Sequence, residues 1–306
     1  MGDNVVARTS LGRPQRVVLA GHLDTVPGDQ PCRVEGETLS GLGAADMKGG
    51  LAVMLDLASS LSAPAHDVTY AFYACEEVER ERNGLLQLPA ELLEGSVAVV
   101  CEPTGCVVEA GCQGVLRARV VLAGRRAHVA RPWTGSNAVH RLAPLLGWLA
   151  SWQPREPEID GCRYRESLQA VRVAGGVASN VVPEQAEVEL NYRFAPDRGT
   201  GPAEAALREM VAGCLEAGDT LEVTDSAPAA HPSLHHPLLH SLVEGSGQPP
   251  RAKLGWTDVA FFAERGVPAA NFGPGDPELA HSAGEHVTAS SLERARDVLG
   301  ALLAGA

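Results

Sequence analysis

Residues 16–24 read RVVLAGHLD. An uninterrupted apolar run that ends in polar residues predicts a buried strand followed by a loop. Further along the chain, apolar residues at helical spacing predict a helix over 50–61, and the apolar segments 68–74 and 97–101 predict two more buried strands. The order strand, helix, strand, strand predicts an open α/β sheet whose carboxyl edge carries the functional site.

Continuous apolar runs give way at about residue 113 to partly alternating segments, and the first type of pattern returns near residue 225. Between them we expect four strands and two helices, at 115–122, 137–152, 168–173, 186–194, 202–217 and 221–223. A helix over 256–266 and a strand over 269–272 then return to the first sheet. The sequence therefore predicts a discontinuous catalytic domain, 1–112 with 225–306, and an inserted α+β domain over 113–224.

The bulk composition excludes several classes of protein. The 306 residues are 45% hydrophobic, enough to form a sizeable core, and carry a formal charge of -13. That charge would repel a phosphate backbone, so nucleic acids and anionic membranes are poor partners. The apolar runs are too short to span a bilayer, and the first residues lack the features of a secretion signal.

The seven cysteines are odd in number and irregularly spaced, at positions 32, 75, 101, 106, 112, 162 and 214. No pair has the CxxC spacing of a zinc knuckle. We interpret them as reduced thiols and expect a cytoplasmic protein.

Two candidate metal-binding motifs lie near the first strand. His22 and Asp24 end that strand, where the Asp24 carboxylate could hold the His22 ring while the other ring nitrogen binds a metal. A surface HxD pair without function is about as common. Asp46 is flanked by glycines just before a helix, and its alternative interpretation is an ordinary helix N-cap.

Carboxylates also follow the next two strands. Glu76 and Glu77 directly follow one of them, so that one could bind a metal and the other could act as a general base, unless they form a solvated acidic turn. Glu102 follows the other strand, and His281 lies on a loop near the carboxyl terminus. Together with His22 and Asp46, these residue types suit zinc or a similar divalent ion.

The motifs GHLDTVP, GLGAADMKGG, CEEVE, CEPT and AHSA, in this order, resemble the zinc-dependent deacylase and exopeptidase superfamily, which includes acetylornithine deacetylase, aminoacylases and succinyl-diaminopimelate desuccinylase. The resemblance covers essentially the whole chain. It implies a mixed-sheet catalytic domain with an inserted α+β lid and dimerisation domain. Residues 255–281 look most like the desuccinylase branch.

The resemblance implies a role for each metal-site residue. His22 and Glu102 would bind one Zn²⁺, Glu77 and His281 would bind the other, and Asp46 would bridge the two ions. Co²⁺ could substitute for Zn²⁺.

The same resemblance implies the remaining catalytic roles. Glu76 becomes the general base and Asp24 the partner of His22. His128, on the lid, would polarise the scissile carbonyl in the site of a partner subunit, which implies a homodimer.

Substrate recognition is also implied by the resemblance. Asn180 and Arg193 resemble lid positions that hold substrate carboxylates, and Thr257 would face the same pocket. The chain departs from the pattern at 112–114, CQG, where some desuccinylases carry arginines. Arg125, Arg126 or Arg193 would then have to bind the succinyl carboxylate.

The resemblance to the desuccinylase branch implies hydrolysis of N-succinyl-LL-2,6-diaminopimelate, a small N-acylated amino acid, in lysine and diaminopimelate biosynthesis. The alternatives are acetylornithine deacetylase or another N-acyl-amino-acid deacylase, and a truncated homologue that binds such compounds without cleaving them. The resemblance also implies tens of residues before the first metal-binding histidine, so either the start is assigned too late or the fold lacks a layer. If that layer is absent, we expect exposed apolar sheet surface. The histidine-rich segment 231–240 is interpreted as a solvated linker and helix start.

Overall fold

The computed structural model describes residues 2–305 and contains a seven-stranded mixed sheet. In spatial order its strands are β1 (Val5–Arg8), β5 (Asp67–Tyr73), β2 (Arg16–His22), β6 (Val97–Val100), β17 (Ala269–Asn271), β7 (Glu109–Ala110) and β16 (Arg251–Ala252). The central strands β5, β2, β6 and β17 are parallel, so their carboxyl ends meet at one edge of the sheet.

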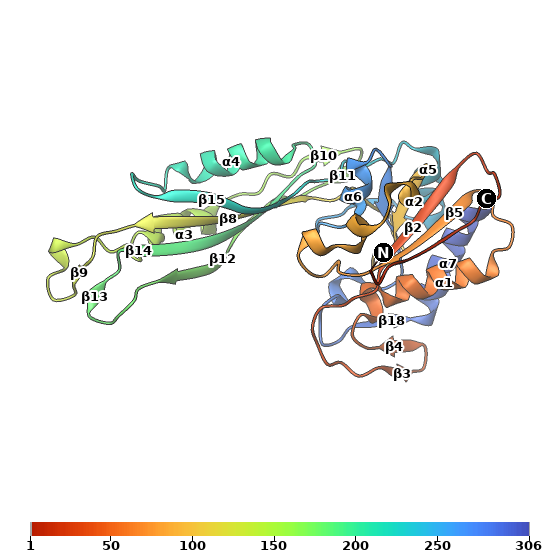
Figure 1. The fold of residues 1–306 in the computed structure, drawn as a ribbon, viewed down its shortest axis with the longest axis horizontal. Helices are drawn as coiled ribbons and strands as arrows, with labels where there is room; N and C mark the ends of the chain where they lie inside the picture. Colours follow the sequence, from red (N-terminus) through yellow and green to blue (C-terminus); the bar gives the residue numbers. More distant parts are fainter. Residues whose placement is uncertain (1, 306) are drawn as a thin grey trace.

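Helices cover both faces of this sheet (Figure 1). One face packs against α1 (Gly49–Ser60), α5 (Pro237–Ser246) and α7 (Ala289–Ala304). The other packs against η3 (Gly84–Gln87), α2 (Ala90–Leu93) and α6 (Val259–Glu264).

Strand β2 shows why the sheet is a core element. Val17 and Leu19 face one cluster, Val18 and Ala20 face the other, and all four are 0% exposed. Burying a side chain the size of valine or leucine contributes roughly 1.5–3 kcal/mol. Both faces of this strand are therefore covered, and its apolar side chains are not exposed.

The inserted unit is a four-stranded antiparallel sheet, here called the lid. Its strands are, in spatial order, β12 (Ser167–Gly175), β14 (Gln185–Phe194), β8 (Gly114–Ala123) and β15 (Thr220–Ala227). Helices α3 (Leu142–Ser151) and α4 (Thr200–Ala212) cover one face through a shared apolar cluster. Figure 1 shows the lid extending away from the seven-stranded sheet, with β9 (Ala127–His128) and β13 (Val181–Val182) at its far tip.

Short elements complete the fold. They are β3 (Arg33–Glu35), β4 (Thr38–Ser40), η1 (Ala44–Lys48), η2 (Arg80–Arg82), η4 (Pro132–Thr134), β10 (Glu158–Ile159), β11 (Cys162–Arg163), η5 (Pro277–Leu279) and β18 (His286–Thr288). Where the chain enters and leaves the lid, Cys112 and Ala230 exchange two main-chain hydrogen bonds. Both crossings are therefore tied together at the base of the lid.

Several element boundaries differ from the predicted ones. Helix α3 begins at Leu142 because the Asn137 side chain accepts hydrogen bonds from the main-chain N–H groups of Val139 and His140, which forms a turn instead of a helix. Strand β15 runs to Ala227, so the lid sheet extends past residue 224. Within residues 2–305, no helix combines the length and the apolar character needed to cross a membrane.

Candidate metal centre

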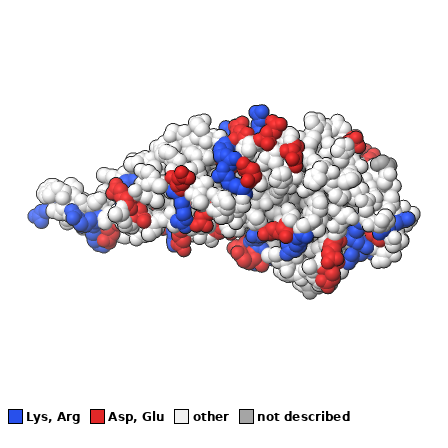
Figure 2. Space-filling view, turned by 90° about the horizontal axis from the view of Figure 1, so that it is seen from above, with Lys and Arg blue, Asp and Glu red and all other residues white. Residues whose placement is uncertain are grey.

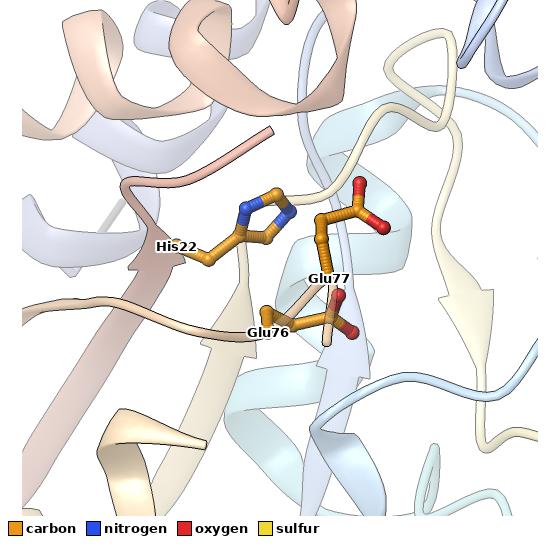
Figure 3. Close-up of side chains that lie close together, drawn as sticks. All are labelled: His22, Glu76 and Glu77. Carbon is orange, nitrogen blue, oxygen red and sulfur yellow. The ribbon is translucent and has the colours of Figure 1, made fainter. Parts of the chain in front are cut away.

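Three neighbouring parallel strands deliver acidic and imidazole side chains to the same place. His22 is the last residue of β2, Glu76 and Glu77 follow β5, and Glu102 follows β6. Figure 3 shows His22, Glu76 and Glu77 projecting from neighbouring strand ends into one space. The carboxyl edge of the sheet is thus where these groups converge, as expected for a parallel α/β sheet.

Asp46 lies between the two candidate histidine ligands. Its Oδ1 is 3.1 Å from His22 Nε2 and its Oδ2 is 3.4 Å from His281 Nε2. The alternative N-cap interpretation does not hold, because the N-cap of α1 is Lys48 and Asp46 has non-helical backbone angles. Asp46 is therefore free to present one oxygen to each histidine.

The last candidate ligand reaches the centre from a distant part of the chain. His281 lies beyond η5, in the left-handed backbone region at φ 60, and its Nε2 is 2.7 Å from Glu77 Oε1. The side chain of His281 is 47% exposed, whereas that of His22 is 1% exposed. One half of the centre is consequently open to solvent and the other half is buried.

The arrangement of donor atoms fits divalent metal ions. Within residues 2–305, three sets of three side chains have ligand atoms within 4.8 Å of one another: His22, Asp46 and Glu102; Asp46, Glu77 and His281; and His22, Glu76 and Glu77. Asp46 belongs to the first two sets, so the donors form two half-sites that share one carboxylate. Imidazole and carboxylate donors in this mixture suit zinc and similar ions.

The electrostatics of the centre also favour a bound cation. Burial, with the nearby Asp46 charge, raises the pKa of Glu102 to about 7. Burial and the Asp258 and Glu102 charges raise the pKa of Glu76 well above its usual range. Burial lowers the pKa of His22, but the Asp46 hydrogen bond and the Glu102 charge outweigh it and raise the pKa. A dication would offset this crowding of carboxylates.

Asp24 contacts both His22 and the loop that carries Glu76 and Glu77. Its carboxylate accepts hydrogen bonds from the main-chain N–H groups of Glu76 and Glu77, both at 3.1 Å. His22 Nδ1 lies 2.9 Å from the Asp24 main-chain carbonyl and 3.8 Å from the carboxylate. The chain turns after His22, which brings the Asp24 carbonyl to Nδ1. Because a carbonyl oxygen only accepts, Nδ1 carries the proton in this contact and Nε2 remains available for a metal ion.

A buried hydrogen-bonded group supports the loop that carries Glu76. Asp258 is 1% exposed, and its carboxylate accepts from the Tyr73 hydroxyl at 2.7 Å and from Asn83 Nδ2 at 3.0 and 3.1 Å. Burial raises the pKa of Asp258. The sequence analysis did not identify this group, although its acidic residue, Asp258, lies within the segment 255–281 that resembles the desuccinylases.

A cleft of 510 Å³ separates the centre from the uncovered face of the lid sheet. Glu76, Glu77 and His281 line it on one side, and Arg117 and Arg193 on the other. Arg193 Nε donates to the Asn191 side chain, and within residues 2–305 no carboxylate pairs with this guanidinium. Burial and the Arg117 charge lower the pKa of Arg193. An anion between the two arginines would relieve this repulsion.

Thr257 and the residues at the lid tip lie elsewhere. Thr257 is 4% exposed and its hydroxyl donates to Asn271. The neighbouring Trp256 is among the residues that line the cleft. Asn180 precedes β13, and its main-chain carbonyl accepts from Val129 beside His128. Asn180 and His128 are exposed at the lid tip, away from the centre of their own chain (Figure 1).

The other candidate residues make local contacts. Arg126 pairs with Glu184, and Arg125 forms an isolated bridge with Ser136, both near the lid tip. All seven cysteines are free. His236 caps the N-terminus of α5, as expected for a helix start.

Comparison with known proteins agrees with this geometry. The chain is 50% identical to a Mycobacterium tuberculosis protein provisionally named succinyl-diaminopimelate desuccinylase DapE, an alignment that covers 99% of this chain and 86% of the relative. It is 44% identical to the succinyl-diaminopimelate desuccinylase of Corynebacterium glutamicum, over 92% of this chain and 79% of the relative.

Solved structures show the same fold at low sequence identity. The aminopeptidase PepT of Bacillus cereus superposes with a TM-score of 0.77 at 17% identity, covering 98% of this chain and 84% of that one. A metallo-carboxypeptidase of the M20 family from Sulfolobus solfataricus superposes with a TM-score of 0.72 at 14% identity, covering 98% and 87%. The profile of one peptidase family matches residues 18–305, and the chain therefore belongs to peptidase family M20/M25/M40.

Proposed function

We propose that this protein hydrolyses the amide bond of N-succinyl-LL-2,6-diaminopimelate, yielding succinate and LL-2,6-diaminopimelate, in the cytoplasm. The observation that carries the proposal is the position of Asp46 between His22 and His281, with Glu77 and Glu102 completing two half-sites. Such a shared carboxylate suits a pair of divalent ions. We assign two Zn²⁺ ions to these two half-sites, where Co²⁺ could replace them.

The protein groups divide the chemistry between them. When bound, the two Zn²⁺ ions would lower the pKa of a water molecule and offset the negative charge that develops on the amide oxygen. Glu76 lines the cleft beside the half-sites and takes the proton of the attacking water. As the C–N bond breaks, Glu76 delivers that proton to the leaving amine. The raised pKa of Glu76 suits a group that must hold a proton between these two steps.

A homodimer completes this proposal. His128 lies on β9 at the far tip of the lid, so it would act in the site of a partner subunit (Figure 1). Strand β12 is an edge strand on which Val171 is 61% and Val173 is 49% exposed. An exposed apolar edge strand is a natural surface for pairing with a second copy.

Two observations support a substrate that carries a carboxylate beyond the scissile amide. Arg117 and Arg193 face the centre across the cleft, where a succinyl or amino-acid carboxylate would pair with them. The relatives at 44% and 50% identity are named succinyl-diaminopimelate desuccinylases. Arg125 and Arg126 lie near the lid tip, so they could bind the succinyl carboxylate only in the site of a partner subunit.

The decisive experiment measures succinate release by the purified protein. We expect turnover of N-succinyl-LL-2,6-diaminopimelate that is abolished by a chelator and restored by Zn²⁺ or Co²⁺. N-acetylornithine is the comparison substrate, because it has the same kind of amide with an uncharged acyl group. Faster turnover of the acetyl compound would contradict the proposed substrate, and activity unaffected by chelation would contradict the metal-dependent mechanism.

A further inference from the structure

Glu285 is a buried carboxylate that binds the loop carrying Asp46. It is 1% exposed, and its two oxygens accept three main-chain hydrogen bonds. Oε2 accepts from Gly43 N at 2.9 Å, and Oε1 accepts from Ala45 N at 3.0 Å and from Asp46 N at 2.9 Å. One of the three donors is therefore the amide of the bridging residue itself.

The main chain of Glu285 is anchored to the same loop and to the His281 turn. Its carbonyl accepts from Gly41 N at 3.2 Å, and its own N–H donates to the Ser282 carbonyl at 3.2 Å. The next residue, His286, begins β18 and pairs with Ser40 of β4, immediately before the Asp46 loop. Glu285 thus lies where the two metal-binding segments meet.

The loop needs such an external acceptor because it is not a regular helix. Gly43 has φ 73, and Asp46 and Met47 have non-helical backbone angles. A loop of this shape cannot satisfy all of its N–H groups internally, and buried N–H groups without acceptors are costly. A charged carboxylate with two oxygens can accept all three hydrogen bonds at once.

We propose that Glu285 is a positioning residue of the metal centre, which sets the orientation of the bridging Asp46 relative to His281. It is not itself one of the side chains whose donor atoms cluster at the centre. Its effect passes through the Asp46 main chain, and the inference rests on the metal pair of the proposed function. Groups that orient metal ligands typically account for about 10- to 100-fold in metal affinity.

The test measures Zn²⁺ binding to metal-free protein by competition with a chromophoric chelator, so the readout does not depend on activity. In Glu285→Gln, one carboxylate oxygen becomes an NH₂ group that cannot accept a hydrogen bond. We expect this variant to bind Zn²⁺ about 10- to 100-fold more weakly than the wild type. Glu285→Asp keeps the charge but is one methylene shorter, so its affinity should lie between the two.

Asp67 offers a matched control far from the centre. Its carboxylate also accepts main-chain hydrogen bonds, from Leu11 N at 2.7 Å and Arg13 N at 3.0 Å, and it anchors a loop without metal ligands. Asp67→Asn should therefore lower stability without changing Zn²⁺ affinity. Equal losses of affinity in Asp67→Asn and Glu285→Gln would show a general loss of stability and overturn the inference.

The remaining outcomes are also decisive. Wild-type affinity in Glu285→Gln contradicts the positioning role while leaving the proposed function intact. If Glu285→Gln does not fold, Glu285→Asp decides, because wild-type affinity in that variant also contradicts the role. A wild-type protein that binds no Zn²⁺ contradicts the proposed function itself.

Discussion

Adjacent carboxylates at the end of β5 have different surroundings. Glu77 Oε1 lies 2.7 Å from His281, whereas burial and the charges of Asp258 and Glu102 raise the pKa of Glu76. This difference supports a ligand role for Glu77 and a proton-transfer role for Glu76.

Replacing the proposed general base tests that division. Glu76→Gln keeps the shape of the side chain but cannot take a proton, so kcat should fall by about 10²- to 10⁴-fold. The number of bound metal ions should stay the same, as measured by elemental analysis of the purified variant. Glu79→Gln is the control, since Glu79 lies on the same loop with its side chain 72% exposed. A loss of bound metal in Glu76→Gln would instead identify Glu76 as a ligand.

Arg117 carries a prediction about specificity. Its guanidinium lines the cleft, and within residues 2–305 its one ion pair is a long one, with Nε 3.6 Å from Asp225 Oδ2. Arg117→Met should reduce kcat/KM for the succinyl substrate by about 10- to 100-fold, the effect of one charge-assisted contact. If Arg117 binds the succinyl carboxylate, turnover of N-acetylornithine, whose acyl group is uncharged, should change little.

Arg119→Met is the matched control for this prediction. Arg119 lies two residues further along the same face of β8 and pairs with Glu222 at 2.6 Å. It is outside the residues that line the cleft. Equal effects of the two substitutions on the succinyl substrate would argue against a specific role for Arg117.

The sequence identified the residues that converge at the centre but not those that support them. His22, Glu76 and Glu102 were predictable because each ends or follows an apolar strand. Glu285 was not, because its partners are main-chain N–H groups as far as 242 positions away. Arg117 was not identified because its neighbours in the sequence show only that it lies on the exposed face of a strand, and they do not show that this face borders the cleft.

At the scale of elements, continuous apolar runs were the reliable signal. Strands β2, β5 and β6 were predicted within about a residue, since both of their faces are buried. Strand β1 was missed because it is a short edge strand with mostly exposed residues. The start of α3 was placed too early because a side-chain hydrogen bond from a turn competes with the helix.

One loop at the edge of the catalytic sheet gives a prediction for stability. The Asp67 carboxylate, at the start of β5, accepts hydrogen bonds from Leu11 N, Arg13 N and the Thr9 hydroxyl. These bonds, with that from Leu11 the largest contributor, lower the pKa of Asp67 to about 2. Asp67→Asn should therefore reduce the urea midpoint of unfolding at pH 7.

The pH dependence of this loss has a definite sign. Because the folded pKa is depressed, the stabilisation is complete above the ordinary aspartate pKa of about 3.9 and is lost as the pH falls through about 2. The difference in midpoint between wild type and Asp67→Asn should be the same at pH 7 and pH 5, and smaller at pH 3. A difference that grows on acidification would contradict this interpretation.

At the scale of the whole molecule, the lid is long and its tip is remote from the catalytic sheet (Figure 1). Acidic and basic side chains are interspersed on the face seen in Figure 2, and the formal charge is -13. No basic surface dominates this view. The shape therefore matters most for His128, which is carried on β9 at the tip.

Mixing two inactive variants tests whether His128 acts across a dimer. His128→Ala lacks the tip residue and Glu76→Gln lacks the base, so each homodimer should be nearly inactive. In a mixed dimer, the site with an intact Glu76 receives an intact His128 from its partner, whereas the other site lacks both groups. Random exchange of equal amounts makes about half of the dimers mixed, so activity should return to about one quarter of the wild-type value. Size-exclusion chromatography of tagged variants would confirm that exchange has occurred, and mixed dimers without activity would show that His128 acts within its own subunit or not at all.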